Sequence, residues 1–456
     1  MKRRLEAAVA GVRAAYGELR VRRIWTSIVR VRDRTVEVAR TDERAGGVAR
    51  TVSPDTGWGI TGFTGTDRLD EHLARAADLA SAGGAHARRP VQLATIPIRQ
   101  LEQAESPAGD PRDVSLAAKQ EVAERLAARL RAVDRRIVGG RVTCRDEVVE
   151  TWLATSEGTW LHELRCETSL AALAVAEESG NVEWALGSFG SRDWPSLAEA
   201  VETVAGTANR ALDRLHAAPV RAGRYTVVLD PAAAGLMAHR LVSHLGRTPL
   251  SGADPDALPI GLRVGPESLT IGDDPTAAGL RGTLTLDDEG TPARRAVLVQ
   301  NGVVTGHLTT RETAMRTRQS PSGHARAGTL SAAPAPRAAN SFVAPGQGKL
   351  EDLLSGVDRG VYIADLLAAE QGSGQLTLRA AAARMIRNGR LAEPVKGVQL
   401  DGSLLALLGR LDAVAGDFTW SPAAARCRDG AGGAVAVSLG APHLRLVDVP
   451  VTEGMP

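Results

Sequence analysis

The sequence predicts an α+β fold in two parts, an N-terminal domain of mixed helices and strands over residues 1–220 and a mostly β C-terminal domain over residues 221–456. Two observations predict this division. In the first half, apolar residues at helical spacing alternate with strand-like runs. In the second half, two Asn-Gly dipeptides lie between apolar runs, and Asn-Gly favours the positive φ angles of a tight hairpin turn.

The N-terminal domain is expected to contain helices and strands in alternation. An amphipathic helix is expected over residues 1–20, then strands over 21–38 and short strands over 46–63. Three further helices are expected at 67–81, 113–134 and 196–217. Residues 138–159 predict two strands separated by the charged run Arg145–Glu147. This content predicts an α+β domain that ends near residue 220.

The C-terminal domain is expected to consist mainly of hairpins. Residues 296–308 and 385–393 each place an Asn-Gly pair between two apolar arms. Residues 442–451 predict a last strand. The segment 320–346 is dense in Pro, Gly, Ala and Ser, and a loop of that length is typical of a mobile or functional segment.

Composition excludes several classes of function. The net charge is +2 and aromatic residues make up 3% of the chain, which disfavours both a duplex-binding surface and a base-stacking platform. Three cysteines do not make a disulfide framework. No apolar run approaches the length needed to cross a bilayer. We therefore expect a cytoplasmic protein that binds neither nucleic acid nor membrane.

One stretch of the C-terminal half carries the residue types of a metal site. The apolar run Arg224–Leu229 predicts a strand and ends in Asp230-Pro231, with Asp230 as the N-cap and Pro231 as the first residue of a helix. His239 and His244 follow, and paired imidazoles are common metal ligands. Residues five apart diverge by roughly 140° on an ideal α-helix. Both rings can face one ion only if a π-type turn or a helix end lies between them.

Several short segments occur in the order of a known family. His239-Arg240, with His244 five residues on, stands where that family has His-Glu-x-x-x-His. Cys427 begins a closing segment similar to the family's Cys-Gly-x-x-Gly-Gln. Four more similar segments lie between them, at 287–292, 336–340, 387–390 and 394–397. On these residues the chain resembles the TldD/PmbA metallopeptidases, also called modulators of DNA gyrase, over essentially its whole length.

The resemblance implies a TldD-like subunit whose zinc ion is held by His239, His244 and Cys427. A thiolate and two imidazoles leave one tetrahedral position for water or substrate. The charged neighbours of Cys427 predict a setting unlike a core. The resemblance also implies a heterodimer with a TldE-like partner, with a homodimer as the alternative, and a cavity in which an extended peptide binds as an added strand. Arg337 and Asn340 fall in a family segment and are candidates for the substrate path, with loop hydrogen bonding as the alternative.

Arg240 departs from the family pattern because it occupies the position of the catalytic glutamate. A guanidinium stays charged in proteins and cannot take a proton from water. Arg247 stands near the position of a second family acid and is a candidate for substrate binding. Three outcomes stay open: a metal site with slow hydrolysis, a metal-free anion pocket lined by Arg240 and Arg247, or a different base. Glu289 is the candidate for that base, with a solvated hairpin turn as its alternative.

Two classes of function follow from these residues. The first is a TldD-type zinc peptidase that acts on a peptide or an amino-acid amide, with activity altered or narrowed by Arg240, as would suit maturation of a specialised peptide. The second is a non-catalytic subunit that holds a peptide or a partner within such a complex. A DNA-associated regulator is disfavoured by the charge balance.

Overall fold

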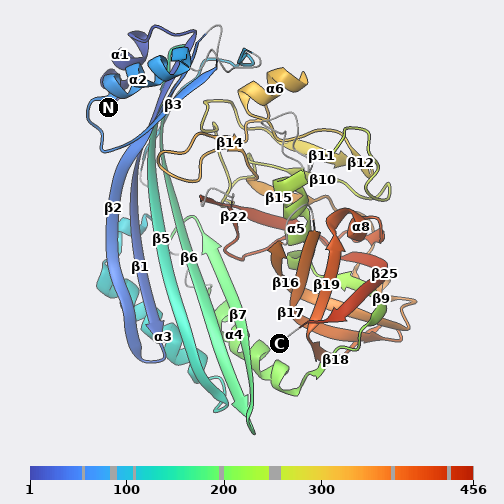
Figure 1. The fold of residues 1–456 in the computed structure, drawn as a ribbon. Helices are drawn as coiled ribbons and strands as arrows, with labels where there is room; N and C mark the ends of the chain where they lie inside the picture. Colours follow the sequence, from blue (N-terminus) through green and yellow to red (C-terminus); the bar gives the residue numbers. More distant parts are fainter. Residues whose placement is uncertain are drawn as a thin grey trace.

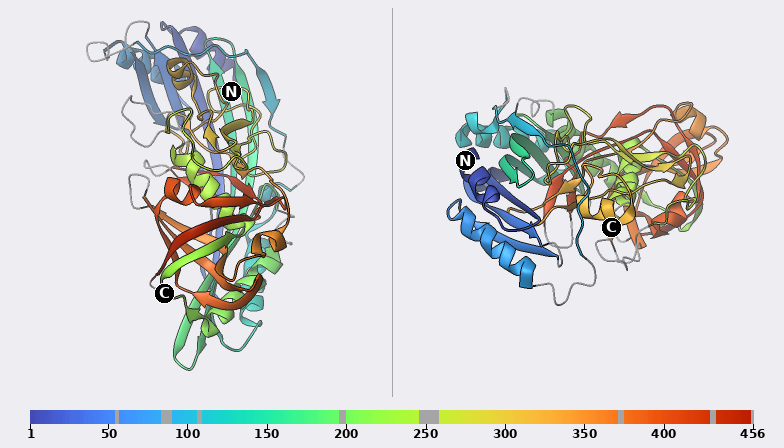
Figure 2. Two further views of the ribbon diagram at one scale, coloured as in Figure 1. Left: turned by 90° about the vertical axis from the view of Figure 1, so that its right-hand side faces the viewer. Right: turned by 90° about the horizontal axis from the view of Figure 1, so that it is seen from above.

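The computed structural model describes residues 1–53, 57–82, 90–105, 109–194, 200–245, 258–370, 375–428 and 433–454. A long, curved N-terminal sheet stands beside a C-terminal assembly of smaller sheets and short helices (Figure 1). The view from above places the same two bodies side by side (Figure 2). This arrangement confirms the predicted α+β fold with a β-rich C-terminal part.

The N-terminal sheet has seven strands in the order β3-β2-β1-β5-β6-β4, with β7 paired to β6. Their bounds are β1 Tyr16–Arg32, β2 Thr35–Val52, β3 Trp58–Thr64, β4 Gln100–Gln103, β5 Ile137–Thr155, β6 Trp160–Glu178 and β7 Asn181–Ser191. The prediction of two strands within 138–159 is wrong, because β5 runs unbroken through the charged run at 145–147. Asp146 lies on the inward face of β5 and is paired there with Lys119.

Four α-helices and one 3-10 turn pack on this sheet or beside it: α1 Lys2–Ala10, α2 Leu69–Ala82, η2 Pro111–Asp113, α3 Leu116–Arg131 and α4 Ala200–His216. Helices α3 and α4 share one apolar core with β1, β5, β6 and β7, and α1 and α2 share a second with β1, β2 and β3. The helices predicted at 67–81, 113–134 and 196–217 are confirmed. The helix predicted at 1–20 is half that length, since Tyr16 already begins β1.

Two larger sheets build the C-terminal part. The first has the order β16-β9-β25-β19-β17-β18-β8, with β20 on β25, and an added β16–β17 pairing closes five of its strands into a ring. Its bounds are β8 Ala218–Pro219, β9 Gly223–Leu229, β16 Arg359–Glu370, β17 Gln375–Arg387, β18 Arg390–Lys396, β19 Val398–Ser403, β20 Leu411–Val414 and β25 Leu444–Glu453. The second has the order β12-β11-β10-β15-β24-β21. Its bounds are β10 Ile271–Asp273, β11 Ala296–Gln300, β12 Val303–Val304, β15 Asn340–Val343, β21 Thr419–Trp420 and β24 Ser438–Ala441.

The remaining C-terminal elements are short. They are the two-stranded pairs β13 Ala325–Arg326 with β14 Ala335–Pro336 and β22 Arg426–Arg428 with β23 Ala434–Ala436, and the helices α5 Pro231–Arg240, η4 Leu241–Leu245, α6 Arg311–Thr317, α7 Leu350–Leu354 and α8 Leu404–Leu408. Both predicted Asn-Gly hairpins are confirmed, with positive φ at Asn301, Gly302, Asn388 and Gly389. The prediction of a mobile loop at 320–346 is wrong: this segment contains β13, β14 and the whole of β15, and its side chains are largely buried.

Buried ion pairs join the two parts of the molecule. Arg22 on β1 reaches Asp288 at 2.5 Å, and Arg50 on β2 reaches Glu289 at 3.0 Å. The predicted division at residue 220 stays a prediction, although the strands of each sheet fall on one side of it except for β8. Across the described residues, no helix combines the length and the apolarity that crossing a membrane requires.

Lys119 forms the centre of a buried polar cluster under the N-terminal sheet. Its ammonium lies 2.7 Å from the Asp146 carboxylate, donates to Ser27 Oγ at 3.1 Å and to the Pro111 carbonyl at 2.6 Å, and faces the Trp25 ring. Both charged side chains are 1% exposed. Removing one partner of such a pair leaves a buried charge uncompensated.

Replacing Lys119 with methionine is therefore expected to lower the free energy of unfolding by about 3–5 kcal/mol. The matched control is Lys2→Met, which removes an exposed pair with Glu6 and is expected to cost less than about 1 kcal/mol. Urea unfolding followed by circular dichroism measures both. Equal, small shifts in the two midpoints would contradict a structural role for the buried pair.

Candidate functional site

Helix α5 places His239 in the protein interior. The helix starts where β9 ends, because the Asp230 carboxylate accepts a hydrogen bond from the Ala233 amide at 2.7 Å and Pro231 supplies the first helical residue. Both predicted start signals are confirmed. Small residues on the buried face let α5 lie close to β24, so that Gly235 stands next to Leu439. His239 is 5% exposed near the end of this helix.

The turn after α5 is π-helical and covers Leu241–Leu245. His239 and His244 can share one ion only if a π-type turn or a helix end lies between them, and the π-type turn is present. A turn closed between residues five apart removes the divergence that an ideal α-helix would impose. The side chain of His244 and the whole of Arg247 lie outside the described residues, so their predicted roles stay predictions.

Cys427 on β22 meets the end of α5. Ser243 Oγ lies 3.1 Å from His239 Nε2 and 3.6 Å from Cys427 Sγ, and the thiol is itself within hydrogen-bonding reach of His239. Cys427 is 5% exposed and belongs to the C-terminal apolar core, so the expectation of a setting unlike a core is wrong. The structure thus brings together two of the three predicted zinc ligands, which are 188 residues apart in the chain.

A buried chain of hydrogen bonds orients the His239 ring. Ser341 Oγ donates to the Asp273 carboxylate at 2.8 Å and lies 3.1 Å from His239 Nδ1. Because the Ser341 proton is committed to Asp273, Nδ1 must be the donor to Ser341, and Nε2 is directed toward Ser243 and Cys427. A second-sphere acceptor of this kind is typical of histidines that bind metals through the other nitrogen.

Asp273 is the fixed end of that chain. It is fully buried, lies 3.2 Å from His324 Nε2 and accepts hydrogen bonds from the amides of Ala339 and Asn340 at 2.8 and 3.1 Å. Burial alone would raise the pKa of this carboxyl, but His324, Ser341 and the backbone donors outweigh it and lower the pKa. The carboxylate is therefore ionised and holds Ser341 in place.

The Cys427 thiol is strongly acidic in this setting. Burial opposes its ionisation, but the hydrogen bond and charge of His239, the Ser243 hydroxyl and the Arg337 guanidinium lower its pKa to about 6. A thiolate is the form that binds metal. Cys427 and His239 Nε2 thus form a sulfur–nitrogen donor pair of the kind that suits zinc. Within the described residues, three or more His, Cys, Asp or Glu side chains are not grouped as a complete metal site would require.

Arg337 and Asn340 make structural contacts near the site. The Arg337 guanidinium is 1% exposed and donates to the backbone carbonyls of Cys427 at 2.6 Å and Gly433 at 3.2 Å. Asn340 is fully buried, donates to the Asp274 carbonyl at 2.8 Å and accepts from the Gly282 amide at 3.0 Å. Their proposed contact with substrate stays a prediction, and the hydrogen bonds of the loop alternative are present.

The two residues considered for proton transfer lie in different settings. Arg240 is half-buried at the last position of α5, and on an α-helix it points about 100° away from His239. Glu289 is 2% exposed, which rules out a solvated hairpin turn. It is held between Arg50 at 3.0 Å and the backbone amide of Arg311 at 2.8 Å. Both of its carboxylate oxygens are thus engaged in structural contacts.

Sequence reasoning missed Ser243, Ser341, Asp273 and His324. Ser243 could have been found, because it lies four residues after His239 and so faces the same side of an α-helix. Asp273 and Ser341 become neighbours only through the antiparallel pairing of β10 with β15, in which they are register partners. Nothing in their spacing along the chain indicates that pairing.

Comparison with known proteins matches most of the chain. The sequence model of the PmbA/TldA metallopeptidase C-terminal domain matches residues 222–453, and that of the central domain matches residues 109–218. Among curated proteins, the chain is 33% identical over 411 residues to a metalloprotease of Synechocystis sp., covering 89% of this chain and 88% of that protein.

Solved structures share the fold from end to end. A protein described as a modulator of DNA gyrase from Thermotoga maritima superposes with a TM-score of 0.76 at 19% identity and covers 99% of both chains. TldE from Thermococcus kodakarensis superposes with a TM-score of 0.71 at 19% identity and covers 96% of this chain and 97% of that one. Together with the sequence matches, this extent of similarity leads to one conclusion: the chain belongs to the PmbA/TldD metallopeptidase family.

Proposed function

We propose that this chain is a TldD-type zinc metallopeptidase subunit that acts on an extended peptide or an amino-acid amide, with its hydrolytic activity altered by Arg240. The observation that carries the proposal is the meeting of His239 Nε2, Ser243 Oγ and Cys427 Sγ in the protein interior. The family membership and the metalloprotease name of the Synechocystis relative support it. Zinc is the cofactor that suits one thiolate and two imidazoles.

Each residue of the site has a defined task in this proposal. His239, Cys427 and His244 would hold the ion. Bound zinc would supply Lewis acidity toward a carbonyl and make a coordinated water more acidic. Ser341 and Asp273 fix the orientation of the His239 ring so that Nε2 faces Cys427, and the lowered pKa of Cys427, about 6, favours the thiolate form of its sulfur.

Arg240 changes what the site can do to a substrate. A glutamate at this position could take a proton from water, whereas a guanidinium offers only donors and a fixed positive charge. Arg240 is suited to bind a carboxylate or to stabilise an oxyanion. We infer a narrowed or slowed reaction, of the kind that would serve maturation of a particular peptide.

A TldE-like second subunit completes the proposal, and a homodimer is the alternative. The likeness to TldE from Thermococcus kodakarensis supports a paired assembly at the level of fold. A row of apolar side chains also supports it: Val182, Trp184 and Leu186 point outward from β7 and are 56%, 40% and 38% exposed. Exposed apolar rows of this kind commonly mark protein interfaces. The alternative function is a non-catalytic subunit that holds a peptide or a partner.

Purified protein is expected to carry about one equivalent of zinc, and Cys427→Ser is expected to lose it because a serine hydroxyl is a much weaker zinc ligand. The matched control is Cys144→Ser, since Cys144 is buried beneath α3 and burial raises its pKa to about 12. Elemental analysis of the three proteins measures the outcome. Absence of zinc from the unmodified chain at any loading would favour the non-catalytic subunit.

Arg240→Glu is expected to raise peptidase activity by about 10²–10⁴-fold, the contribution of a positioned general base. Arg240→Gln is the matched control, because it removes the same positive charge without adding a base. Hydrolysis of a labelled peptide, assayed with and without a co-expressed partner, measures both. Equal gains in the two variants would mean that the charge of Arg240, and not the missing base, limits the reaction.

Ser341→Ala is expected to weaken zinc affinity by about 10–100-fold, because His239 would lose the acceptor that fixes its ring. Ser322→Ala is the control, since Ser322 is equally buried but bonds to Thr309 in another loop. Competition with a fluorescent chelator measures the dissociation constants. Unchanged affinity in Ser341→Ala would contradict the orienting role of the Asp273–Ser341 chain.

A further inference from the structure

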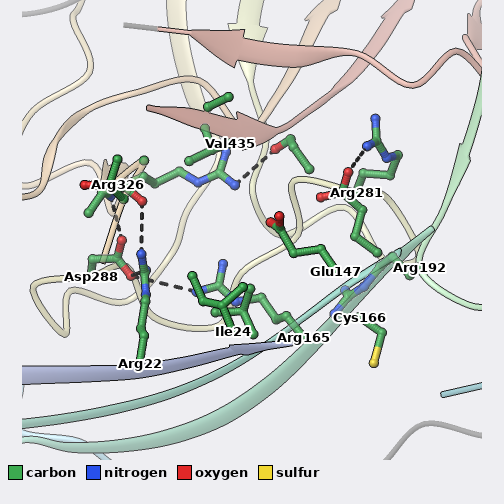
Figure 3. A pocket seen from close by; sticks show the side chains of 17 residues that line it. Arg22, Ile24, Glu147, Arg165, Cys166, Arg192, Arg281, Asp288, Arg326 and Val435 are labelled. Atoms are coloured by element: carbon green, nitrogen blue, oxygen red, sulfur yellow. Dashed lines mark hydrogen bonds and ion pairs between the residues drawn. The ribbon is translucent and has the colours of Figure 1, made fainter. Parts of the chain in front are cut away.

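A second cavity lies between the N-terminal sheet and the C-terminal part, on the far side of the hairpin that carries Cys427. It has a volume of about 90 Å³ and is enclosed by side chains from β1, β5 and β6 on one side and from β13 and β23 on the other (Figure 3). A space of this size has room for several water molecules and therefore for a carboxylate group. We call it the arginine cavity.

The charges around this cavity are unbalanced. Five arginines and three carboxylates line it. Each carboxylate already has a cation. Asp288 pairs with Arg22 at 2.5 Å, Glu167 with Arg281 and with Arg426, and Glu147 with Arg145 at 2.7 Å. Arg165 pairs with Glu163 at 3.2 Å, whereas Arg192 and Arg326 have no carboxylate partner among the described residues, so the cavity holds an excess of positive charge.

Arg326 and Arg192 carry most of this excess. Arg326 is 5% exposed and donates from its two terminal nitrogens to the carbonyls of Ala338 and Ala436, at 2.6 and 3.0 Å, and no carboxylate among the described residues lies at ion-pair distance from it. Arg192 is partly buried and makes neither a hydrogen bond nor an ion pair with any described residue. Burial, and then the neighbouring charge of Arg165, lower the pKa of Arg192. A cation withdrawn from water without a paired carboxylate is costly, and an incoming anion would offset that cost.

The arginine cavity is adjacent to the proposed zinc site. Val435, which lines the cavity, is the register partner of Cys427 in the β22–β23 hairpin. Residues opposed in an antiparallel pair have Cα atoms about 4.5–5.5 Å apart. The two sites thus lie on either side of one short hairpin.

We propose that the arginine cavity binds a carboxylate of the peptide ligand, either its C-terminal carboxylate or an acidic side chain, through Arg192 and its neighbour Arg165. Guanidinium groups bind carboxylates with paired, charge-assisted hydrogen bonds. This inference rests on the proposed function, because it names the class of peptide that the site would take.

Binding of three matched peptides tests this proposal. They are an N-acetylated trialanine with a free C-terminus, its C-terminal amide, and the amide with glutamate as the last residue. Calorimetry in the presence of a chelator measures affinity without hydrolysis. At least one carboxylate-bearing peptide is expected to bind about tenfold or more tightly than the neutral amide. Which of the two does so identifies the source of the carboxylate.

Arg192→Gln is expected to bring the affinities of the charged and neutral peptides to within about twofold of each other. This variant breaks no hydrogen bond or ion pair with a described residue, so loss of the fold is not expected. The control is Arg34→Gln, which removes the same charge from the exposed β1–β2 turn and is expected to leave the preference unchanged.

Two results would overturn the proposal: equal affinity for all three peptides, including failure of all three to bind at millimolar concentration, or an undiminished preference in Arg192→Gln. Failure of the proposed function has a different signature. A chain that prefers carboxylate peptides but never holds zinc would keep the arginine cavity as a binding site and lose the peptidase assignment.

Discussion

Cys427 reaches Ser243 and His239 across 184 or more residues of chain, and the rest of the site depends on that contact. Three features hold it. The π-helical turn after α5 gives Ser243 and His244 their backbone positions. The Asp273–Ser341 pair fixes the His239 ring. Arg337, buried beside β22, donates to the Cys427 carbonyl and lowers the pKa of the thiol by its charge.

The side chain next to the first proposed zinc ligand is positively charged, whereas a hydrolytic zinc centre has a negatively charged glutamate there. A glutamate beside the first histidine would bring a base and a negative charge, and Arg240 brings neither. The neighbouring arginine cavity adds further positive charge on the other side of the β22–β23 hairpin. Excess positive charge at both ends of a peptide-binding region favours anionic ligands. The proposed metal ligands are thus flanked by arginines on both sides.

Much of the local structure could be predicted from the sequence, because it depends on neighbouring residues. The N-cap Asp230, the helical spacing of Leu126 and Leu130 and the Asn-Gly turns each act within a few positions. The unbroken length of β5 could not be predicted in this way. Within its charged run, Asp146 pairs with Lys119 from helix α3, so the strand continues where local signals predict an interruption.

The site was predictable only in part, because some of its residues acquire their roles through contacts between distant parts of the chain. His239 and Cys427 could be named as candidate ligands because histidine and cysteine commonly bind zinc. Asp273, Ser341 and His324 acquire their roles from strand pairing and burial. The charged neighbours of Cys427 predicted an exposed setting, but the thiol is buried in the core. Its neighbour Arg426 points the other way and pairs with Glu147 and Glu167 on the N-terminal sheet.

X-ray absorption at the zinc edge of the purified, metal-loaded protein would show whether Cys427 binds the metal. We expect a four-coordinate ion with one sulfur neighbour at roughly 2.3 Å and its other ligands nitrogen or oxygen at roughly 2.0–2.2 Å. A zinc ion bound entirely by nitrogen and oxygen would place Cys427 outside the site and would contradict its role as a ligand.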